Sequence, residues 1–106
     1  MSIKYAVYKE SFEFNPRKYK TPEEAFLAYD DHYNEIVALC DSIEEARDLL
    51  NKIKVSTIEF GYTLARATIA YIEEADFEQN DEGEWEFIAG SDIWDIKYEN
   101  LKECDE

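Results

Sequence analysis

The acidic residues of this chain are concentrated in its last third, and that concentration limits how the chain can fold. Residues 73–106 contain 14 Asp and Glu but only 2 Lys and Arg, whereas residues 1–72 contain 12 acidic and 9 basic residues. The net charge of −15 is large, because small soluble domains typically carry a charge of magnitude ~2–8. Repulsion between like charges opposes folding, so we expect a charged exterior. Because 45% of the residues are hydrophobic and 15% are aromatic, the chain is predicted to fold around a core rather than remain a disordered acidic tail.

Acidic and apolar residues alternate in the segment that begins at Thr68, which is the pattern of a β-strand. Glu73, Ala75 and Phe77 fall on one side of such a strand, because side chains alternate between its two faces. A turn is predicted at Asn80–Gly83. The other face of the resulting hairpin would carry a ladder of carboxylates from both strands, namely Glu74, Asp76, Glu78, Glu84 and Glu86.

Hydrophobic periodicity and helix-capping patterns predict the remaining elements. Thr21–Glu24 and Ser42–Glu45 are capping boxes, in which a hydroxyl and a Glu side chain satisfy free N–H groups at the start of a helix. Residues 55–65 alternate like a strand, although Ser56 and Thr57 also fit the start of a short helix; we favour the strand. The predicted elements are a strand at 3–9, a connector at 11–20 with the basic residues Arg17, Lys18 and Lys20, a helix at 21–33, a strand at 35–40, a helix from 42 to 53, a strand at 68–77 and one or two strands within 85–98.

These elements predict a single α+β domain spanning residues 1–106. We expect an antiparallel sheet of four to five strands with two helices packed on one face, and frayed residues at 99–106. No apolar run resembles a signal peptide or a transmembrane helix, so the expected location is the cytoplasm. The two cysteines form no CxxC motif; we expect Cys40 to be buried and Cys104 to be exposed.

The chain contains no recognisable catalytic motif, and its many carboxylates leave a paired-carboxylate mechanism open without singling out any pair. His32 is the single histidine, and we expect it on a helix surface. A nucleotide-binding loop is hard to build from three glycines. A calcium loop beginning at Asp76 would need Gly and Glu at its sixth and twelfth positions, which hold Asp81 and Phe87 instead. The sequence therefore predicts no catalytic residue, no metal site and no cofactor, and we expect a binding protein rather than an enzyme.

The acidic segment is the candidate binding surface. Carboxylates repel phosphates, so direct binding to nucleic acid or to an anionic membrane is disfavoured. The expected partner is a basic protein surface, such as that of a nucleic-acid-binding enzyme. Trp85 and Trp94 lie in the same segment and would either anchor a partner or face the core; for Trp85 we favour the core. The candidate partner-binding residues are Glu73, Glu74, Asp76, Glu78, Asp81, Glu82, Glu84, Glu86, Asp92 and Asp95.

Small size, strong acidity and clustered charge together resemble the strategy of small phage and mobile-element proteins that block restriction or CRISPR nucleases. The resemblance covers these three properties and no sequence motif. It implies an inhibitor whose carboxylates stand in for phosphates in a nucleic-acid-binding cleft. The alternative is a non-inhibitory interaction module, assembled as a homodimer through an aromatic sheet face, whose acidic residues form a solvated surface that prevents edge-to-edge aggregation. Salt separates the two hypotheses, because only the charge-mimicking complex would weaken steeply as ionic strength rises.

Overall fold

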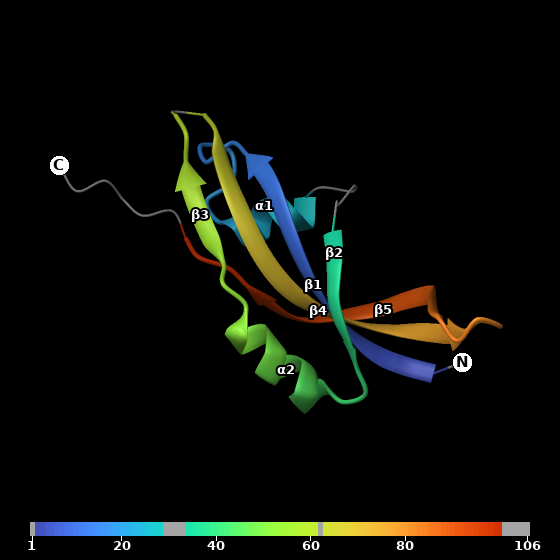
Figure 1. Ribbon diagram of the computed structural model, residues 1–106. Helices are drawn as coiled ribbons and strands as arrows, with labels where there is room; N and C mark the ends of the chain where they lie inside the picture. The colour runs from blue at the N-terminus through green and yellow to red at the C-terminus, as the bar shows by residue number, and fades with distance from the viewer. Residues whose placement is uncertain (1, 29–33, 62, 101–106) are drawn as a thin grey trace.

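Two long antiparallel strands, β1 (Ser2–Phe14) and β4 (Ala65–Gln79), form the spine of the structure (Figure 1). They pair without a register shift from one end of β1 to the other. Because the strands run in opposite directions, the basic connector that follows Phe14 and the turn that follows Gln79 lie at opposite ends of the pair.

The computed structural model describes residues 2–28, 34–61 and 63–100. Its sheet has the strand order β2-β1-β4-β3, with β5 also paired to β4, and every pair is antiparallel. The predicted α+β class and the predicted antiparallel sheet are confirmed. The remaining elements are α1 (Pro22–Ala28), β2 (Asn34–Cys40), α2 (Ile43–Lys52), β3 (Ser56–Glu59) and β5 (Trp85–Lys97).

Strands β3 and β5 pair with successive parts of β4. A strand has two edges, and β1 occupies one edge of β4, so β3 and β5 share the other. β3 pairs with Ala65–Thr68 and β5 with residues 70–79. Of the one or two strands predicted within 85–98, the structure has one, β5. Its ladder with β4 is irregular at three places, which add twist to the hairpin.

Several strand boundaries differ from the prediction. β1 continues to Phe14, where a turn-rich connector was predicted from Ser11 onward. The reason is that side chains continue to alternate between the two faces of the strand beyond Ser11. Phe12 and Phe14 pack against the core, whereas Glu13 forms an ion pair with Arg66. β4 likewise begins three residues before the predicted start. The strand interpretation of residues 55–65 is confirmed for the four residues of β3.

Local capping interactions begin both helices as predicted. The Ser42 hydroxyl accepts a hydrogen bond from the backbone N–H of Glu45 (3.2 Å), and the Thr21 hydroxyl accepts one from Glu24 (3.2 Å). The Glu24 carboxylate also accepts a hydrogen bond from the backbone N–H of Lys20 (2.8 Å). The two hydroxyl contacts satisfy N–H groups that the first helical turn leaves free, and the Glu24 carboxylate satisfies an N–H group just before the helix.

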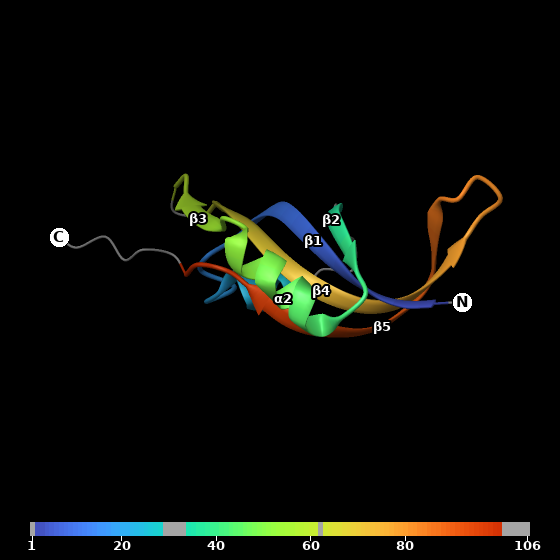
Figure 2. The same ribbon diagram turned by 60° about the horizontal axis from the view of Figure 1, so that its bottom comes forward.

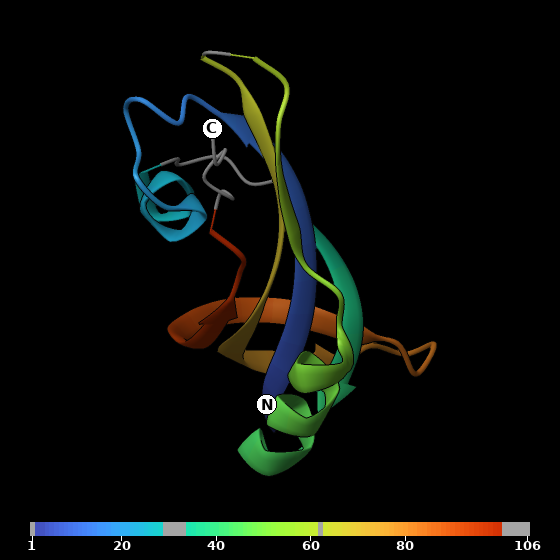
Figure 3. The same cartoon turned by 90° about the vertical axis from the view of Figure 1, so that its left-hand side faces the viewer.

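The expectation that both helices pack on one face is not confirmed, because they join different hydrophobic clusters. Figure 3 shows the two helices lying well apart from each other. Phe26 of α1 packs with Ile69 and Tyr71 of β4, whereas Leu50 of α2 packs with Ala70 and Ile72. These β4 positions alternate, and alternate residues of a strand point to opposite faces. Alternation predicts that each face of β4 needs a cover, but it does not predict which helix supplies it.

Some predictions can be compared with the structure only in part. Cys40 is buried, as predicted. Neither helix in the described part of the chain is long and apolar enough to cross a membrane. The predictions for His32, for the rest of the helix at 29–33 and for residues 101–106 with Cys104 lie outside the described residues.

Candidate functional site

The hairpin formed by β4 and β5 carries the acidic segment. Residues 73–95 contain ten Asp and Glu and no Lys or Arg, and these ten are the predicted binding residues. In Figures 1 and 2 the closed end of this hairpin extends past both helices. Its carboxylates therefore lie on a part of the molecule that is open to another macromolecule.

Asn80 organises the turn at the closed end. Its side-chain oxygen accepts hydrogen bonds from the backbone N–H groups of Glu82 and Glu84, each at 2.9 Å. Gly83 adopts a positive φ of 83°, a conformation that a residue without Cβ adopts at little cost. This backbone geometry leaves the side chains of Asp81, Glu82 and Glu84 exposed, and we call these three residues the acidic turn.

Register brings five of the ten predicted carboxylates onto one face of the hairpin. Glu78 lies directly opposite Glu86, and Glu74 lies directly opposite Asp92. Residues directly opposite in an antiparallel pair have Cβ atoms about 4.5–5.5 Å apart and share a face. We call the group the carboxylate face; its members are Glu74, Asp76, Glu78, Glu86 and Asp92.

Two of the ten predicted binding residues, Asp95 and Glu73, have surroundings unlike those of the carboxylate face. Asp95 forms an ion pair with Arg47 of α2, with Nε and Oδ2 2.8 Å apart. Glu73 points to the opposite face of β4 and is half-buried, and this desolvation raises the pKa of its carboxyl group. A Cβ added at Gly90 would lie 3.0 Å from Oε2 of Glu73, so the absence of a side chain at position 90 leaves room for this carboxyl group.

The carboxylate face and the acidic turn carry unneutralised charge. Within the described part of the chain, Asp95 is the only member of the ten that forms an ion pair. Lys4 of β1 lies opposite Ala75, on the sheet face away from the carboxylate face. It pairs with Asp41, and its Nζ lies 4.5 Å from the centroid of the Trp85 ring. The internal cations therefore leave most of the acidic charge available to a partner.

Both tryptophans of the hairpin are exposed. Trp85 is 38% exposed and Trp94 is 46% exposed, so the expectation that Trp85 faces the core is wrong. Trp85 lies opposite Gln79 and therefore on the face away from the carboxylates. The ladder shifts register between Tyr71 and Glu73, and Trp94 lies in the β5 segment opposite that shift.

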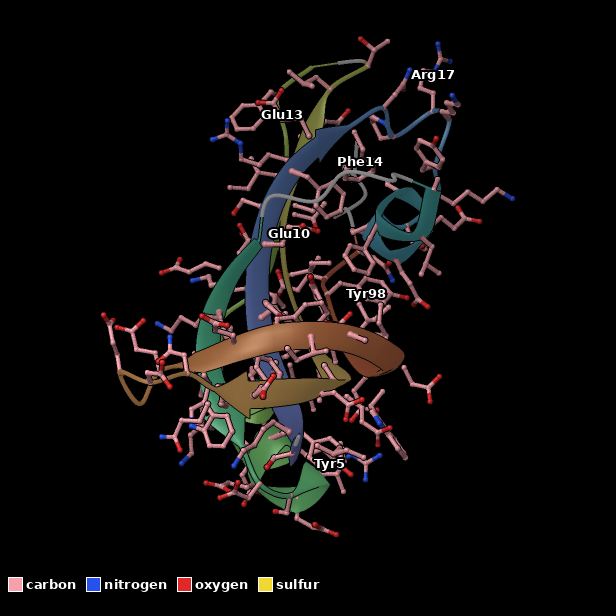
Figure 4. All side chains as sticks on the ribbon, turned by 90° about the vertical axis from the view of Figure 1, so that its right-hand side faces the viewer. Tyr5, Glu10, Glu13, Phe14, Arg17 and Tyr98 are labelled. Atoms are coloured by element: carbon pink, nitrogen blue, oxygen red, sulfur yellow. The ribbon has the colours of Figure 1, made fainter. Side chains whose placement is uncertain are left out.

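Tyr5 of β1 joins the carboxylate face to Trp94. It lies opposite Glu74 on the side away from β5, and its ring contacts Trp94 edge-on at a centroid distance of 6.4 Å. Figure 4 shows Tyr5 at the end of β1 near α2. Burial, then the charge of Glu74 and a hydrogen bond to it, and then the charge of Glu44 raise the pKa of Tyr5. Sequence reasoning missed Tyr5 because its contact with Glu74 joins residues far apart in the chain; its alternation with Ile3 and Val7 was the available signal.

The described residues form no metal centre, and the comparisons with known proteins assign no family. In residues 2–28, 34–61 and 63–100, no group of three or more His, Cys, Asp and Glu side chains is arranged to hold a metal ion. A scan against protein-family models finds no match, and searches of curated proteins and of solved structures find no similar protein. What the structure defines is an antiparallel α+β domain with an acidic hairpin extending from it.

Proposed function

We propose that this protein binds a basic surface of another protein through the carboxylate face and the acidic turn. The carboxylates stand in for the phosphates of a nucleic acid and block a DNA- or RNA-binding enzyme, such as a restriction or CRISPR nuclease. The protein acts by binding rather than by catalysis, and it acts in the cytoplasm. The observation that carries the proposal is the unneutralised pairing of Glu78 with Glu86 and of Glu74 with Asp92.

The charge density of the carboxylate face supports this proposal. From Glu74 to Glu78 the strand advances ~13 Å, at ~3.3 Å per residue. Five carboxylates in that length give about one charge per 3 Å, against one per ~1.7 Å for duplex DNA and one per ~3.4 Å for a single strand. A groove lined with Lys and Arg for phosphate would meet a comparable density of negative charge here.

The electrostatic repulsion between the opposed carboxylates also supports a binding role. Like charges directly opposite each other destabilise a sheet, and scattering the same residues would give equal solubility at a lower cost. On binding, Lys and Arg side chains would replace this repulsion with charge-assisted hydrogen bonds.

The test uses two variants of equal net charge. The first neutralises the carboxylate face by E74Q, D76N, E78Q and E86Q; the second neutralises four exposed acidic residues elsewhere, by E35Q, D48N, E59Q and E99Q. Each tagged protein is incubated with host lysate at low salt, eluted with a salt gradient, and the captured enzyme is then tested for binding to labelled nucleic acid.

We expect the wild type and the second variant to capture a nucleic-acid-binding enzyme, to release it as salt rises and to displace its nucleic acid. The first variant should capture no such enzyme and displace no nucleic acid. Equal behaviour of the two variants would contradict the proposal, because net charge rather than the carboxylate face would then explain binding.

A second candidate function, assembly of a homodimer, is favoured by the exposed apolar side chains of β5. Phe87 is 51% exposed, and Ile88 and Ile93 are also exposed. A dimer formed through these side chains would tolerate high salt. Sedimentation at about 0.05 M and about 0.5 M salt distinguishes the functions, because a monomer at both concentrations excludes the dimer.

A further inference from the structure

A shallow hollow beside the carboxylate face combines an aromatic ring with a carboxylate. It is lined by Asp92, Ile93 and Trp94 of β5. Nearly half of Trp94 is accessible to solvent, and Asp92 is exposed. A cation that enters this hollow would therefore contact an aromatic ring and a negative charge together.

The electrostatics of the hollow favour a positive occupant. Asp92 lies directly opposite Glu74, and neither forms an ion pair within the described part of the chain. The ring of Tyr5, which lies on β1 across β4 from β5, makes a T-shaped contact with Trp94 and limits how the Trp94 ring can turn. Two facing carboxylates beside a supported indole ring attract a cation more strongly than either group alone.

The protein itself shows which cation this ring accommodates. Arg47 of α2 holds its guanidinium carbon 5.9 Å from the centroid of Trp94, while its Nε donates to Asp95 at 2.8 Å. A planar guanidinium is thus already bound between this indole ring and one carboxylate. Trp94 also lines the hollow together with Asp92, so the hollow repeats this combination of an indole ring and a carboxylate.

We infer that the hollow at Asp92 and Trp94 is a subsite for one arginine side chain of the basic partner. The inference rests on the proposed function and names the anchoring contact within that surface. Arginine fits better than lysine, because a guanidinium both stacks on an indole ring and donates in parallel to carboxylate oxygens. The carboxylate face accelerates encounter with the partner, and the Trp94 subsite slows its release.

The first experiment isolates the fluorescence of Trp94. W85F leaves Trp94 as the only tryptophan, and W94F leaves Trp85 as the matched control. Each protein is titrated with N-acetyl-arginine amide, with the lysine analogue and with the citrulline analogue, which has the shape of arginine but no charge. Circular dichroism checks that both variants are folded.

We expect saturable quenching of Trp94 by the arginine probe, at least several-fold weaker quenching by lysine and none by citrulline. D92N in the W85F background should weaken the arginine response several-fold. Equal responses of the two single-tryptophan proteins, or equal responses to arginine and citrulline, would overturn the subsite.

A second experiment separates this inference from the proposed function. With the captured enzyme immobilised, W94L should raise the dissociation rate several-fold and leave the association rate nearly unchanged, whereas E78Q with E86Q should lower the association rate. If W94L dissociates like the wild type while the carboxylate variant loses binding, the subsite is wrong and the proposed function stands. If the arginine titration succeeds but no nucleic-acid-binding enzyme is captured, the subsite stands and the proposed function fails.

Discussion

Glu78 of β4 and Glu86 of β5 lie directly opposite each other on the same face of the hairpin, two like charges at a paired position of the sheet. The side-chain amide of Asn80 donates a hydrogen bond to Glu86 at 3.1 Å, but an amide carries no positive charge. The free protein therefore retains electrostatic strain where the hairpin begins to open from its turn.

Removing one of these charges should stabilise the free protein. We expect E78Q to raise the free energy of unfolding by about 0.2–1 kcal/mol at low salt, because it ends repulsion between directly opposed carboxylates. Urea denaturation at about 0.02 M and about 0.5 M salt checks this, and the gain should shrink at the higher salt. E59Q is the matched control, since Glu59 lies opposite Ala65. An equal gain from E59Q would mean that only net charge matters.

The backbone conformation of Gly83 in the turn predicts how a substitution there changes stability. G83A should lower the free energy of unfolding by about 1–2 kcal/mol, because Gly83 has a positive φ that a residue with Cβ adopts at a cost. G61A is the control, because a Cβ at position 61 would meet no atom within 4 Å and the φ of Gly61 is not in that region. Thermal unfolding of both variants measures the difference; a loss of stability in G61A as large as in G83A would contradict this explanation.

Lys97, the last residue of β5, connects this strand to the end of α2. Its ammonium group donates to the backbone oxygens of Asn51 (2.9 Å) and Ile53 (2.7 Å), which the helix end leaves without helical partners. K97M should therefore cost about 1–3 kcal/mol and accelerate hydrogen exchange in α2. K54M, at an exposed lysine, should change neither. Unchanged exchange in K97M would show that this cap does not stabilise the helix.

Glu73 predicts a dependence of stability on pH. Burial raises its pKa in the folded state above the ordinary value of 4.5, so the folded protein binds this proton more tightly than the unfolded chain does. Its contribution to stability is therefore greatest at acidic pH and is lost as pH rises through the folded-state pKa. E73Q should be more stable than the wild type at about pH 7, and the difference should shrink as pH falls toward about 4. Urea denaturation between these pH values measures it, and a constant difference would contradict this assignment.

Local patterns predicted much of this fold because the interactions concerned are themselves local. The two capping boxes depend on residues three positions apart, and the hydrogen bond to the capping hydroxyl is observed in each, at Thr21 and at Ser42. The turn at Asn80 likewise depends on its own side chain and on Gly83. Alternation on both sides of this turn was sufficient to predict that Glu78 and Glu86 share a face.

Features that depend on tertiary arrangement could not be read from the sequence. A prediction from alternating polar and apolar residues assumes that the two strands pair in a regular ladder, so it gave no indication of the register shift opposite Trp94. It also gave no indication that Arg47, from a helix, would meet that ring, or that Tyr5 would lie opposite Glu74. The exposure of Trp85 has the same origin, because no second layer of structure in the described part of the chain covers its end of the hairpin.

The basic connector and the acidic hairpin lie at opposite ends of the β1–β4 pair, and this separation makes the molecule an electric dipole as well as an anion. Arg17 and Lys18 are exposed at one end, beyond Phe14, while the carboxylates gather at the other, from Glu74 through the acidic turn. In the field of a positively charged surface such a molecule experiences a torque that turns its hairpin forward. Orientation would then precede contact, so that a larger share of collisions begins in the productive pose than random tumbling allows.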